Sequence, residues 1–364
     1  MAVFQRNFGH QSGTDFPATG RLTETNIQSG IHNITGIMTT KFELLTQLKM
    51  HTREWISGEY LSRRLGVSRM AVSKHIGKLK SEGYEIISAP KKGYRLNRAP
   101  DILTSDELRS ELNTKIFGQS EIIYLPQTRS TNLIAREYAS NGSPEGFLII
   151  ADSQTEGRGR QHRYWHSPSG GGIYLSMILR PSLPPNETPV ITLMTAVALL
   201  EAIRMQSEIP LRIKWPNDIL SGDKKLAGIL TEINTYPDSV NFVIVGVGIN
   251  VNTSPEKFPD EIKDIATSIS AETGKYLQRK ELLASFLSIF ETWYALFEKR
   301  EFQAIINRWK SYSDIIGRVV SVDILGTVYS GKVVEIDVDG TLIIEDGKGK
   351  RKRLLSGDII ESTQ

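Results

Sequence analysis

The stretch Glu156–Ser167, which reads EGRGRQHRYWHS, gathers groups that can hold an anion. Its two glycines let the backbone approach a ligand closely, and its arginines present planar forks that match phosphate or carboxylate oxygens. The tryptophan offers a face for stacking on a base. These residues are Gly157, Arg158, Gly159, Arg160, Arg163 and Trp165. The alternative is a mobile surface loop with a buried tryptophan, and the pattern favours an anion site over it.

Ser130-Thr131-Asn132 forms a second polar cluster, at the start of a predicted helix over Asn132–Ser140. Hydroxyl and amide side chains at such a place commonly cap the helix, which is the default interpretation. The same groups suit hydrogen bonding to a small polar head such as a urea carbonyl. The residues alone leave both uses open.

Three more segments place polar residues beside apolar runs. KWPNDIL carries Lys214, Asn217 and Asp218 around a turn, where Asp218 could assist a divalent metal. KKLAGILTE carries Lys225, whose ammonium near a carboxylate and a phosphate would neutralise charge in an adenylation transition state. GVGINVN ends a buried strand at Asn250, whose amide could reach a nucleotide or a metal. None of these is the GxxxxGK(S/T) or GxGxxG pattern, so a nucleotide would be held by a different arrangement.

Strand-like and helix-like runs alternate from about residue 120 to residue 310, which predicts an α/β domain that positions these side chains. The predicted strands are Glu121–Tyr124, Phe147–Ala151, Ile173–Leu179, Leu211–Lys214 and Phe242–Gly248. The predicted helices are Asn132–Ser140, Pro189–Gln206, Arg279–Arg300 and Glu301–Lys310. Short β runs separated by glycine and Asp-Gly turns fill the tail and predict a small barrel of about five strands.

The segment before this domain has the pattern of a winged helix–turn–helix. Ser57 is predicted to cap a first helix, Gly66-Val67 makes a tight turn, and Ser68 caps a second helix. The apolar stripe of the second helix is Val72, Ile76 and Leu79. Its polar face and the basic tip of the hairpin that follows predict contact with DNA. The residues concerned are Ser68, Arg69, Met70, Ser73, Lys74, Lys78, Lys91 and Lys92. A merely solvated face is the alternative.

Charge is distributed unevenly along the 364 residues. The net charge is +3, yet residues 41–100 hold 13 Lys and Arg against 5 Asp and Glu, a net of +8 that leaves −5 for the rest. A basic segment joined to a mildly acidic body indicates a nucleic-acid module attached to something else.

The absence of cysteine excludes disulfides, thiol catalysis and cysteine metal sites, and it suits a reducing compartment, for which we expect the cytoplasm. The few histidines are scattered, so no metal site made of side chains alone is predicted. The longest uninterrupted apolar runs, such as Phe242–Val251, are typical of buried strands, and no membrane partner is expected.

Taken in order, the polar segments resemble the biotin–protein ligase family. The matching segments are Ser130-Thr131-Asn132, Gln154 with Gly157-Arg158-Gly159-Arg160, Lys214-Trp215-Pro216-Asn217-Asp218, Lys225-x-Ala227-Gly228-Ile229-Leu230 and Gly248-Ile249-Asn250. Each piece is common, whereas the ordered set is specific, and the resemblance spans roughly residues 40–364. The winged helix at the front makes the chain similar to the bifunctional subtype, which is a ligase and a biotin-operon repressor in one chain.

The resemblance implies a reaction and its partners. Biotin is activated by ATP as biotinyl-5′-AMP, with Mg²⁺ as cofactor and release of pyrophosphate. It is then transferred to a lysine of a biotin carboxyl carrier domain, with release of AMP. A homodimer that responds to biotinyl-AMP is implied to bind operator DNA and repress genes of biotin synthesis and transport.

The resemblance also implies roles for single residues. Catalytic roles fall to Arg160 and Lys225. The implied biotin contacts are Ser130, Thr131, Asn132, Gln154, Arg158, Gly159, Arg160, Lys225 and Gly228. The implied nucleotide contacts are Arg158, Arg160, Arg163, Trp165, Lys214, Asn217 and Asn250. In repressor-type relatives an arginine near the chain end helps with the nucleotide. Here Ser362 stands near that place, and the candidate substitutes are Arg351, Lys352 and Arg353.

The implied fold is a multidomain α/β protein. We expect a disordered extension over residues 1–38, a winged helix–turn–helix over 39–98 and a linker or linking helix over 99–119. A catalytic domain with a mixed sheet, similar to class II synthetases and lipoate ligases, follows over 120–310. An SH3-like barrel is expected over 311–364.

Three other functions stay open. The chain could be a DNA-binding sensor with little transferase activity, against which the presence of Lys225 and the full arginine loop argue. It could be a ligase for another acid such as lipoate or octanoate, against which Ser130–Asn132 with Gln154 argue. The N-terminal helices could be a structural appendage, against which their basic charge argues. For the main interpretation we expect the loop around Gly157–Arg163 to be mobile when the site is empty.

Overall fold

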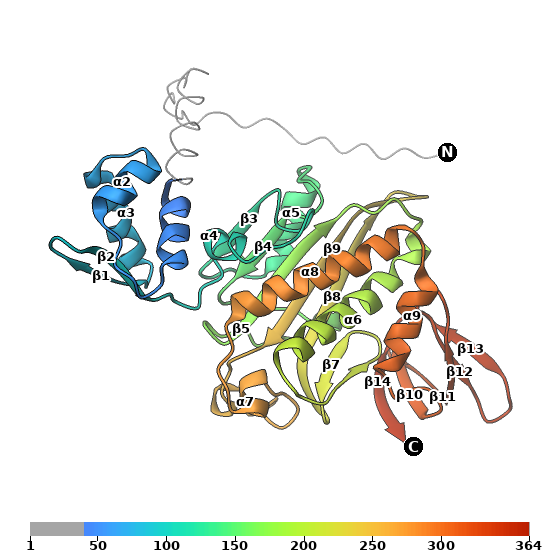
Figure 1. Ribbon diagram of the computed structural model, residues 1–364. Helices are drawn as coiled ribbons and strands as arrows, with labels where there is room; N and C mark the ends of the chain where they lie inside the picture. Colours follow the sequence, from blue (N-terminus) through green and yellow to red (C-terminus); the bar gives the residue numbers. More distant parts are fainter. Residues whose placement is uncertain (1–39, 364) are drawn as a thin grey trace, which may run out of the picture. The chain divides into compact units, whose positions relative to one another are not determined.

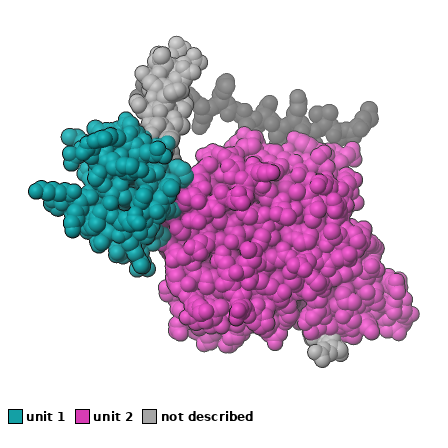
Figure 2. Space-filling model, viewed as in Figure 1, with its two compact units in different colours: residues 1–100 teal, residues 101–364 magenta. Residues whose placement is uncertain are grey.

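The computed structural model describes residues 40–363, with side chains through residue 360, so the extension predicted over residues 1–38 lies outside the described part. The chain divides after Pro100 into unit 1, residues 1–100, and unit 2, residues 101–364 (Figure 2). The finer division into five segments stays a prediction.

Unit 1 has the helix–turn–helix and hairpin that the sequence predicts (Figure 1). Its helices are residues 40–50, α2 (Gly58–Leu65) and α3 (Arg69–Ser81), and its strands are β1 (Glu85–Ala89) and β2 (Gly93–Arg98). Both predicted caps are present, because Ser57 Oγ accepts from the amide of Tyr60 at 3.0 Å and Ser68 Oγ accepts from that of Ala71 at 3.1 Å. Gly66 ends α2 with a left-handed φ of 65°.

The core of unit 1 confirms the predicted stripe on α3. Its buried residues include Leu44, Leu45, Leu48, Leu61, Val72, Ile76, Leu79, Tyr84, Ile86 and Leu96. The hairpin is held to the loop before α2 by two backbone hydrogen bonds between Ile56 and Tyr94, at 2.8 and 2.9 Å. Gly93 permits this contact, since a Cβ there would lie 2.1 Å from the carbonyl oxygen of Ile56.

Unit 2 is built on a seven-stranded mixed sheet with the order β3-β4-β5-β9-β8-β7-β6. Strands β3 and β4 run parallel, and the other neighbours in the sheet are antiparallel. The strands are β3 (Ile122–Leu125), β4 (Leu148–Ala151), β5 (Gly172–Leu179), β6 (Leu211–Lys214), β7 (Asp218–Ser221), β8 (Lys224–Thr235) and β9 (Val240–Asn250). The five predicted strands are present. Strands β7 and β8 were not predicted, because β7 is short and β8 contains lysines and a glycine, which have low strand propensity.

Helices cover both faces of this sheet (Figure 1). The helices of unit 2 are α4 (Ser105–Arg109), α5 (Thr131–Ser140), α6 (Pro189–Gln206), α7 (Ile269–Thr273), α8 (Arg279–Glu298) and α9 (Phe302–Ser311), with short 3-10 turns at Arg160–His162, Pro185–Glu187 and Pro255–Lys257. Ile178 of β5 packs with Ala135 and Ala139 of α5, whereas Leu175 and Met177 belong to the core that contains α6 and α8. Successive side chains of a strand point to opposite faces, so α5 covers one face and α6 with α8 the other.

The tail forms a five-stranded antiparallel sheet with the order β13-β12-β11-β10-β14. Its strands are β10 (Val319–Ile324), β11 (Thr327–Ile336), β12 (Leu342–Glu345), β13 (Arg351–Leu354) and β14 (Asp358–Thr363). Val320, Val322 and Val333 are buried in the same core as α6 and α8. The strand-rich tail is therefore confirmed, and it packs as part of unit 2.

Helix α6 lies in the centre of unit 2. By length and composition, Pro185–Gln206 passes as a candidate membrane span, and it is the one such helix among the described residues. However, 72% of its most apolar window is buried within the protein. A helix that is apolar all round is expected where a sheet and a second helix enclose it, as the sheet and α8 do here.

Candidate functional site

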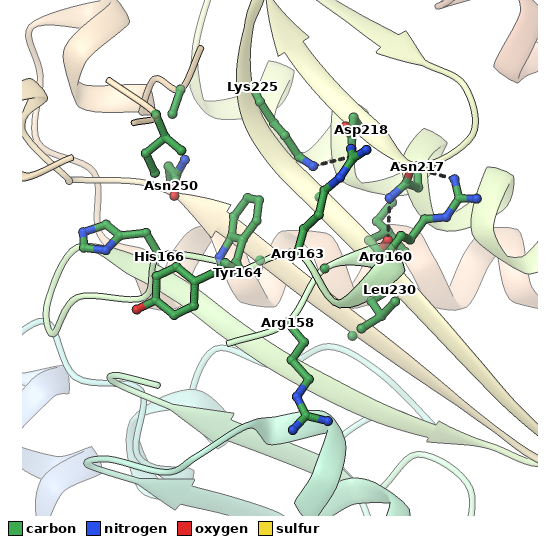
Figure 3. A pocket seen from close by; sticks show the side chains of 18 of the residues that line it. Arg158, Arg160, Arg163, Tyr164, His166, Asn217, Asp218, Lys225, Leu230 and Asn250 are labelled. Atoms are coloured by element: carbon green, nitrogen blue, oxygen red, sulfur yellow. Dashed lines mark hydrogen bonds and ion pairs between the residues drawn. The ribbon is translucent and has the colours of Figure 1, made fainter. Parts of the chain in front are cut away.

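A cavity of about 770 Å³ in unit 2 collects the polar residues that the sequence singled out (Figure 3). Its walls come from the start of α5, the connection between β4 and β5, the β6–β7 turn, and strands β8 and β9. The predicted biotin and nucleotide contacts that line it are Ser130, Thr131, Asn132, Gln154, Arg158, Gly159, Arg160, Arg163, Trp165, Lys214, Asn217, Lys225, Gly228 and Asn250. The fold thus brings the whole predicted set to one cavity, while the contact that each makes with a ligand stays a prediction.

The arginine loop is tied to the C-terminal sheet. Arg160 Nη1 donates to the carbonyl oxygen of Gly357 at 3.1 Å and to Asn217 Oδ1 at 3.4 Å. Asp358 at the start of β14 lies 3.6 Å from Arg160 and 2.8 Å from Arg163. Burial lowers the pKa of the Arg160 guanidinium, and the charge of Asp358 opposes this shift. The carboxylate therefore occupies the position of a counter-ion for both arginines.

The turn inside this loop has an uncommon backbone conformation. Gln161 and His162 have φ values of 51° and 60°, in the left-handed region that residues with a side chain rarely adopt. The turn is closed by a 2.7 Å hydrogen bond from the amide of Gly159 to the carbonyl oxygen of Arg163. Arg158 is directed away from Arg160 and Arg163 and lies 3.6 Å from Glu156 (Figure 3).

Lys225 lies between a carboxylate and an aromatic ring. Its Nζ is 2.7 Å from Asp218 Oδ1 and 5.4 Å from the centroid of the Trp165 ring. The contact with Asp218 is an ion pair without hydrogen-bond geometry, since Asp218 Oδ1 is buried and has no hydrogen-bond partner. Trp165 rests on Gly248, where a Cβ would come within 2.5 Å of the indole. The ammonium is thus held at the cavity wall with protons left for another anion.

Two asparagines among the predicted nucleotide contacts donate hydrogen bonds to backbone carbonyl oxygens. Asn217 Nδ2 donates to the carbonyl oxygen of Ile229 at 2.8 Å, and Asn250 Nδ2 donates to that of Thr267 at 3.0 Å. Both side chains are buried, so their amide oxygens have fixed directions. Lys214 is half-buried and makes no ion pair with the described residues.

The start of α5 is capped differently from the default expectation. Ser130 occupies the N-cap position, but its side chain makes no capping hydrogen bond. Instead, Gln154 Oε1 accepts from the amide of Thr131 at 2.8 Å, while Gln154 Nε2 donates to Ser167 Oγ at 3.0 Å. The capping interpretation of Ser130 is therefore wrong, because a glutamine from the neighbouring strand end satisfies the helix start.

In unit 1, the predicted DNA contacts form an exposed surface on α3 and the β1–β2 turn. The exposed residues are Ser68, Arg69, Met70, Ser73, Lys74, Lys78, Lys91 and Lys92. Trp55, which the sequence analysis did not single out, adds an aromatic face. Its ring centroid lies 5.8 Å from Lys92 Nζ and 4.9 Å from the guanidinium of Arg95.

Several residues of the cavity were not predicted from the sequence. Asp358 reaches it from the end of the chain, and no local signal distinguishes this residue from an ordinary turn aspartate. Tyr164 and His166 flank Trp165 in the same loop and could have been included with it. An apolar wall comes from the segment after β9, through Phe258, Pro259, Ile262, Ile265 and Ala266.

The candidate substitutes for a terminal arginine are wrong. Arg351, Lys352 and Arg353 lie on β13, at the opposite edge of the five-stranded sheet from β14, and do not line the cavity. Arg351 pairs with Glu345 instead, and Lys352 Nζ lies 3.2 Å from the centroid of the Tyr329 ring. The side chain of Ser362 lies outside the described part.

No group of three or more His, Asp or Glu side chains within the described residues could hold a metal ion by itself. Two carboxylates of the cavity, Asp218 and Asp358, each have a buried oxygen that lacks a hydrogen bond. A divalent ion that brings its own phosphate ligands needs only one or two protein carboxylates, so the residues present fit an ion carried by a nucleotide.

Comparisons with known proteins agree with this arrangement. Residues 124–250 match the Biotin/lipoate A/B protein ligase family, and residues 40–95 match an HTH domain family. The chain is 43% identical to the Bifunctional ligase/repressor BirA of Bacillus subtilis (strain 168) over 88% of this chain and 98% of that protein. It is 31% identical to the protein of the same name from Escherichia coli (strain K12), over 84% of this chain and 92% of that one.

A solved structure gives the same result for most of the chain. The biotin protein ligase from Aquifex aeolicus in complex with biotin and ATP superposes with a TM-score of 0.56 at 32% identity. The match covers 67% of this chain and 98% of that one.

Proposed function

The chain belongs to the family of bifunctional biotin ligase/repressor proteins, and from this premise we propose that it ligates biotin to protein and represses transcription in the cytoplasm. The observation that carries the ligase function is the convergence of Lys225, Arg160 and Arg163 on one cavity that Ser130–Asn132 and Gln154 also line. The cations suit a carboxylate and a phosphate, and the neutral polar groups suit an uncharged head group.

The first step joins two anions, and the site must reduce their repulsion. A carboxylate oxygen of biotin attacks the α-phosphorus of ATP, and the bond from that phosphorus to the bridging oxygen breaks as pyrophosphate leaves. Lys225 and Arg160 are the cations that neutralise the reacting carboxylate and phosphate. Mg²⁺ supplies further charge neutralisation when it is bound with ATP, and Asp218 is the residue that would hold it.

The second step uses the mixed anhydride as an acylating agent. A neutral lysine amine of the biotin carboxyl carrier domain attacks the acyl carbon, the acyl carbon–oxygen bond breaks, AMP leaves with the electron pair, and the amine loses a proton. Water competes with the amine for this carbon, so the adenylate has to be enclosed. The loop of Arg158, Arg160 and Arg163 closes over the phosphate, with Trp165, Asn217 and Asn250 on the nucleotide side.

The five-stranded tail takes part in this closure. We assign it the SH3-like barrel of the family, with β14 beside the arginine loop. Asp358 holds Arg160 and Arg163 while no phosphate is present and gives them up when the phosphate arrives. The ion pairs of Asp358 with both arginines support this role.

The repressor function rests on unit 1. The second helix of its helix–turn–helix, α3, presents an exposed polar face with Arg69, Lys74 and Lys78, followed by a basic hairpin tip. One such helix reads a short half-site in the major groove, so a two-fold homodimer on operator DNA is the natural arrangement. Biotinyl-AMP formed in unit 2 is the signal to which DNA binding responds.

A direct experiment separates the ligase from its rivals. The full chain is incubated with ATP, Mg²⁺ and either biotin, lipoate or octanoate, and acyl-adenylates are identified by mass spectrometry. We expect biotinyl-AMP in large excess. A lipoyl or octanoyl adenylate as the main product would make the chain a ligase for another acid, and binding of biotin without any adenylate would make it a sensor.

A further inference from the structure

The base of the arginine loop is fixed to the segment before α5. The amide of Glu156 donates to the carbonyl oxygen of Arg129 at 2.8 Å. Beyond this point the loop closes on itself, since the amide of Trp165 donates to the carbonyl oxygen of Gly157 at 2.9 Å. The backbone of Glu156 is therefore held beside that of Arg129, at the place where the arginine loop leaves the body of unit 2.

The carboxylate of Glu156 has a strong partner and a weak one. Arg129 donates to both of its oxygens, from Nε to Oε1 at 2.8 Å and from Nη2 to Oε2 at 2.9 Å. Two parallel hydrogen bonds of this kind are the strongest contact between an arginine and a carboxylate. Arg158 Nη2 lies 3.6 Å from the same Oε2, beyond hydrogen-bond distance. The pKa of the Glu156 carboxyl is lowered, mainly by the hydrogen bonds from Arg129 and less by the charge of Arg158.

Arg158 is the most weakly held of the three arginines in the loop. It lines the cavity, but its side chain is directed away from Arg160 and Arg163 (Figure 3). Those two arginines share Asp358, whose side chain is only 13% exposed. The side chains of Arg158 and Glu156 are 41% and 43% exposed, so water and salt screen their attraction more strongly.

The cluster of Arg129, Glu156 and Arg158 has one positive charge in excess, because one carboxylate faces two guanidinium groups. Arginine stays charged and can only donate, so neither side chain can relieve the excess by losing a proton. Arg129 takes both carboxylate oxygens, which leaves the excess charge on Arg158. A carboxylate or phosphate in the cavity then competes only with the residual attraction of Glu156.

We propose that Arg129 and Glu156 are positioning residues that set how readily Arg158 turns to the anionic part of the ligand. By occupying both oxygens of Glu156, Arg129 leaves Arg158 with a weak partner that a phosphate can replace. This inference rests on the proposed function, which makes Arg158 a contact of biotinyl-AMP. It adds two residues that do not themselves line the cavity.

The two residues act in opposite directions. Without Arg129, both oxygens of Glu156 can accept from Arg158, which must then leave a two-hydrogen-bond partner before it binds the ligand. In Glu156→Gln the competing charge is absent. A partner that occupies a binding group lowers the apparent affinity by the fraction of the protein it holds. Exposed ion pairs are weak, so each change should shift Kd by about two- to fivefold.

The experiment measures the Kd of biotinyl-5′-AMP by titration calorimetry with the full-length chain and no acceptor. The variants are Arg129→Ala, Glu156→Gln and the double variant, each with Arg158 present and with Arg158→Ala. We expect binding that is about two- to fivefold weaker in Arg129→Ala and about two- to fivefold tighter in Glu156→Gln.

The double variant separates this role from a general effect of charge on the ligand. Without a carboxylate at residue 156, Arg129 has nothing to withhold from Arg158, so the double variant should bind as tightly as Glu156→Gln. A direct attraction of Arg129 for the ligand would instead make the double variant weaker. In Arg158→Ala both changes should leave Kd unaltered, because the side chain through which they act is gone.

Glu137→Gln is the matched control for the loss of a negative charge. Glu137 is exposed on α5 and does not line the cavity, so this variant should bind biotinyl-AMP as the wild type does. The side chains of Arg129 and Glu156 are 69% and 43% exposed, so their variants are expected to fold, and thermal melting checks this.

Two outcomes would overturn the proposal. One is an Arg129→Ala variant that binds biotinyl-AMP as tightly as the wild type, and the other is a tightening by Glu156→Gln that persists in Arg158→Ala. Failure of the proposed function looks different, because the wild type itself would then bind no biotinyl-AMP.

Discussion

Four cations of the cavity lie close to carboxylates of the same chain, whereas Lys214 makes no ion pair with the described residues. Lys225 pairs with Asp218, Arg160 and Arg163 pair with Asp358, and Arg158 lies near Glu156. An incoming phosphate therefore displaces the carboxylates from these cations and takes their place in the ion pairs. Pairing of this kind keeps several arginines close together at a small net charge until the ligand supplies its own anion.

Arg160→Ala should release the adenylate. The variant removes the guanidinium that we propose holds the phosphate, so we expect free biotinyl-AMP to accumulate in solution while transfer to the acceptor falls. The measurement is the amount of adenylate that passes an ultrafiltration membrane after incubation with biotin and ATP. Retention of the adenylate equal to that of the wild type would contradict the role given to Arg160.

Lys225→Met should slow adenylation by about a hundred- to a thousandfold, which is the size of effect seen when one preorganised donor to a developing charge is removed. The matched control is Lys224→Met, because Lys224 is the exposed neighbour on β8 and does not line the cavity. Initial rates of pyrophosphate release check both variants. Equal rates for the two would show that charge at residue 225 is not used.

At the scale of elements, helix caps and turns that depend on neighbouring residues were predicted correctly from the sequence. Ser57, Gly66 and Ser68 act within one helical turn of their own positions, so caps and turns of unit 1 were predicted correctly. The residues that line the cavity were also predicted, because their order along the chain resembles that in the biotin–protein ligase family.

Side-chain contacts between residues far apart in the sequence were not predicted. Asp358 reaches Arg160 only because β14 lies beside the arginine loop, and Gln154 replaces Ser130 as the partner of the α5 start only because β4 ends next to it. Such contacts join residues far apart in the sequence, where no local pattern records them.

Helix α3 should contribute affinity for DNA through its exposed basic face. Lys74→Ala is expected to weaken operator binding in the presence of biotinyl-AMP and to reduce the dependence of log Kd on log salt by about one, as for one lost phosphate contact. Lys299→Ala, an exposed lysine of unit 2, is the control. Fluorescence anisotropy at several salt concentrations gives both quantities, and a slope unchanged by Lys74→Ala would remove this residue from the contact.

At the scale of the whole molecule, the proposed function has one chain make a signal in unit 2 and read DNA with unit 1. Coupling between two sites is reciprocal, so an adenylate that favours the DNA-bound homodimer must itself bind more tightly to that dimer. We expect sedimentation velocity to show more dimer with biotinyl-AMP than with biotin or ATP alone. A monomer–dimer equilibrium that is indifferent to the adenylate would contradict this coupling.

Ligation of biotin to an acceptor lysine is tested most directly by the mass of the acceptor. A biotin carboxyl carrier domain is incubated with the full chain, biotin, ATP and Mg²⁺, and its intact mass is recorded beside the same reaction with Lys225→Met. We expect one biotinyl group on one lysine with the wild-type chain, together with AMP and pyrophosphate in equal amounts, and little product with Lys225→Met. An acceptor of unchanged mass in the presence of the folded wild-type chain and all three substrates would contradict this expectation.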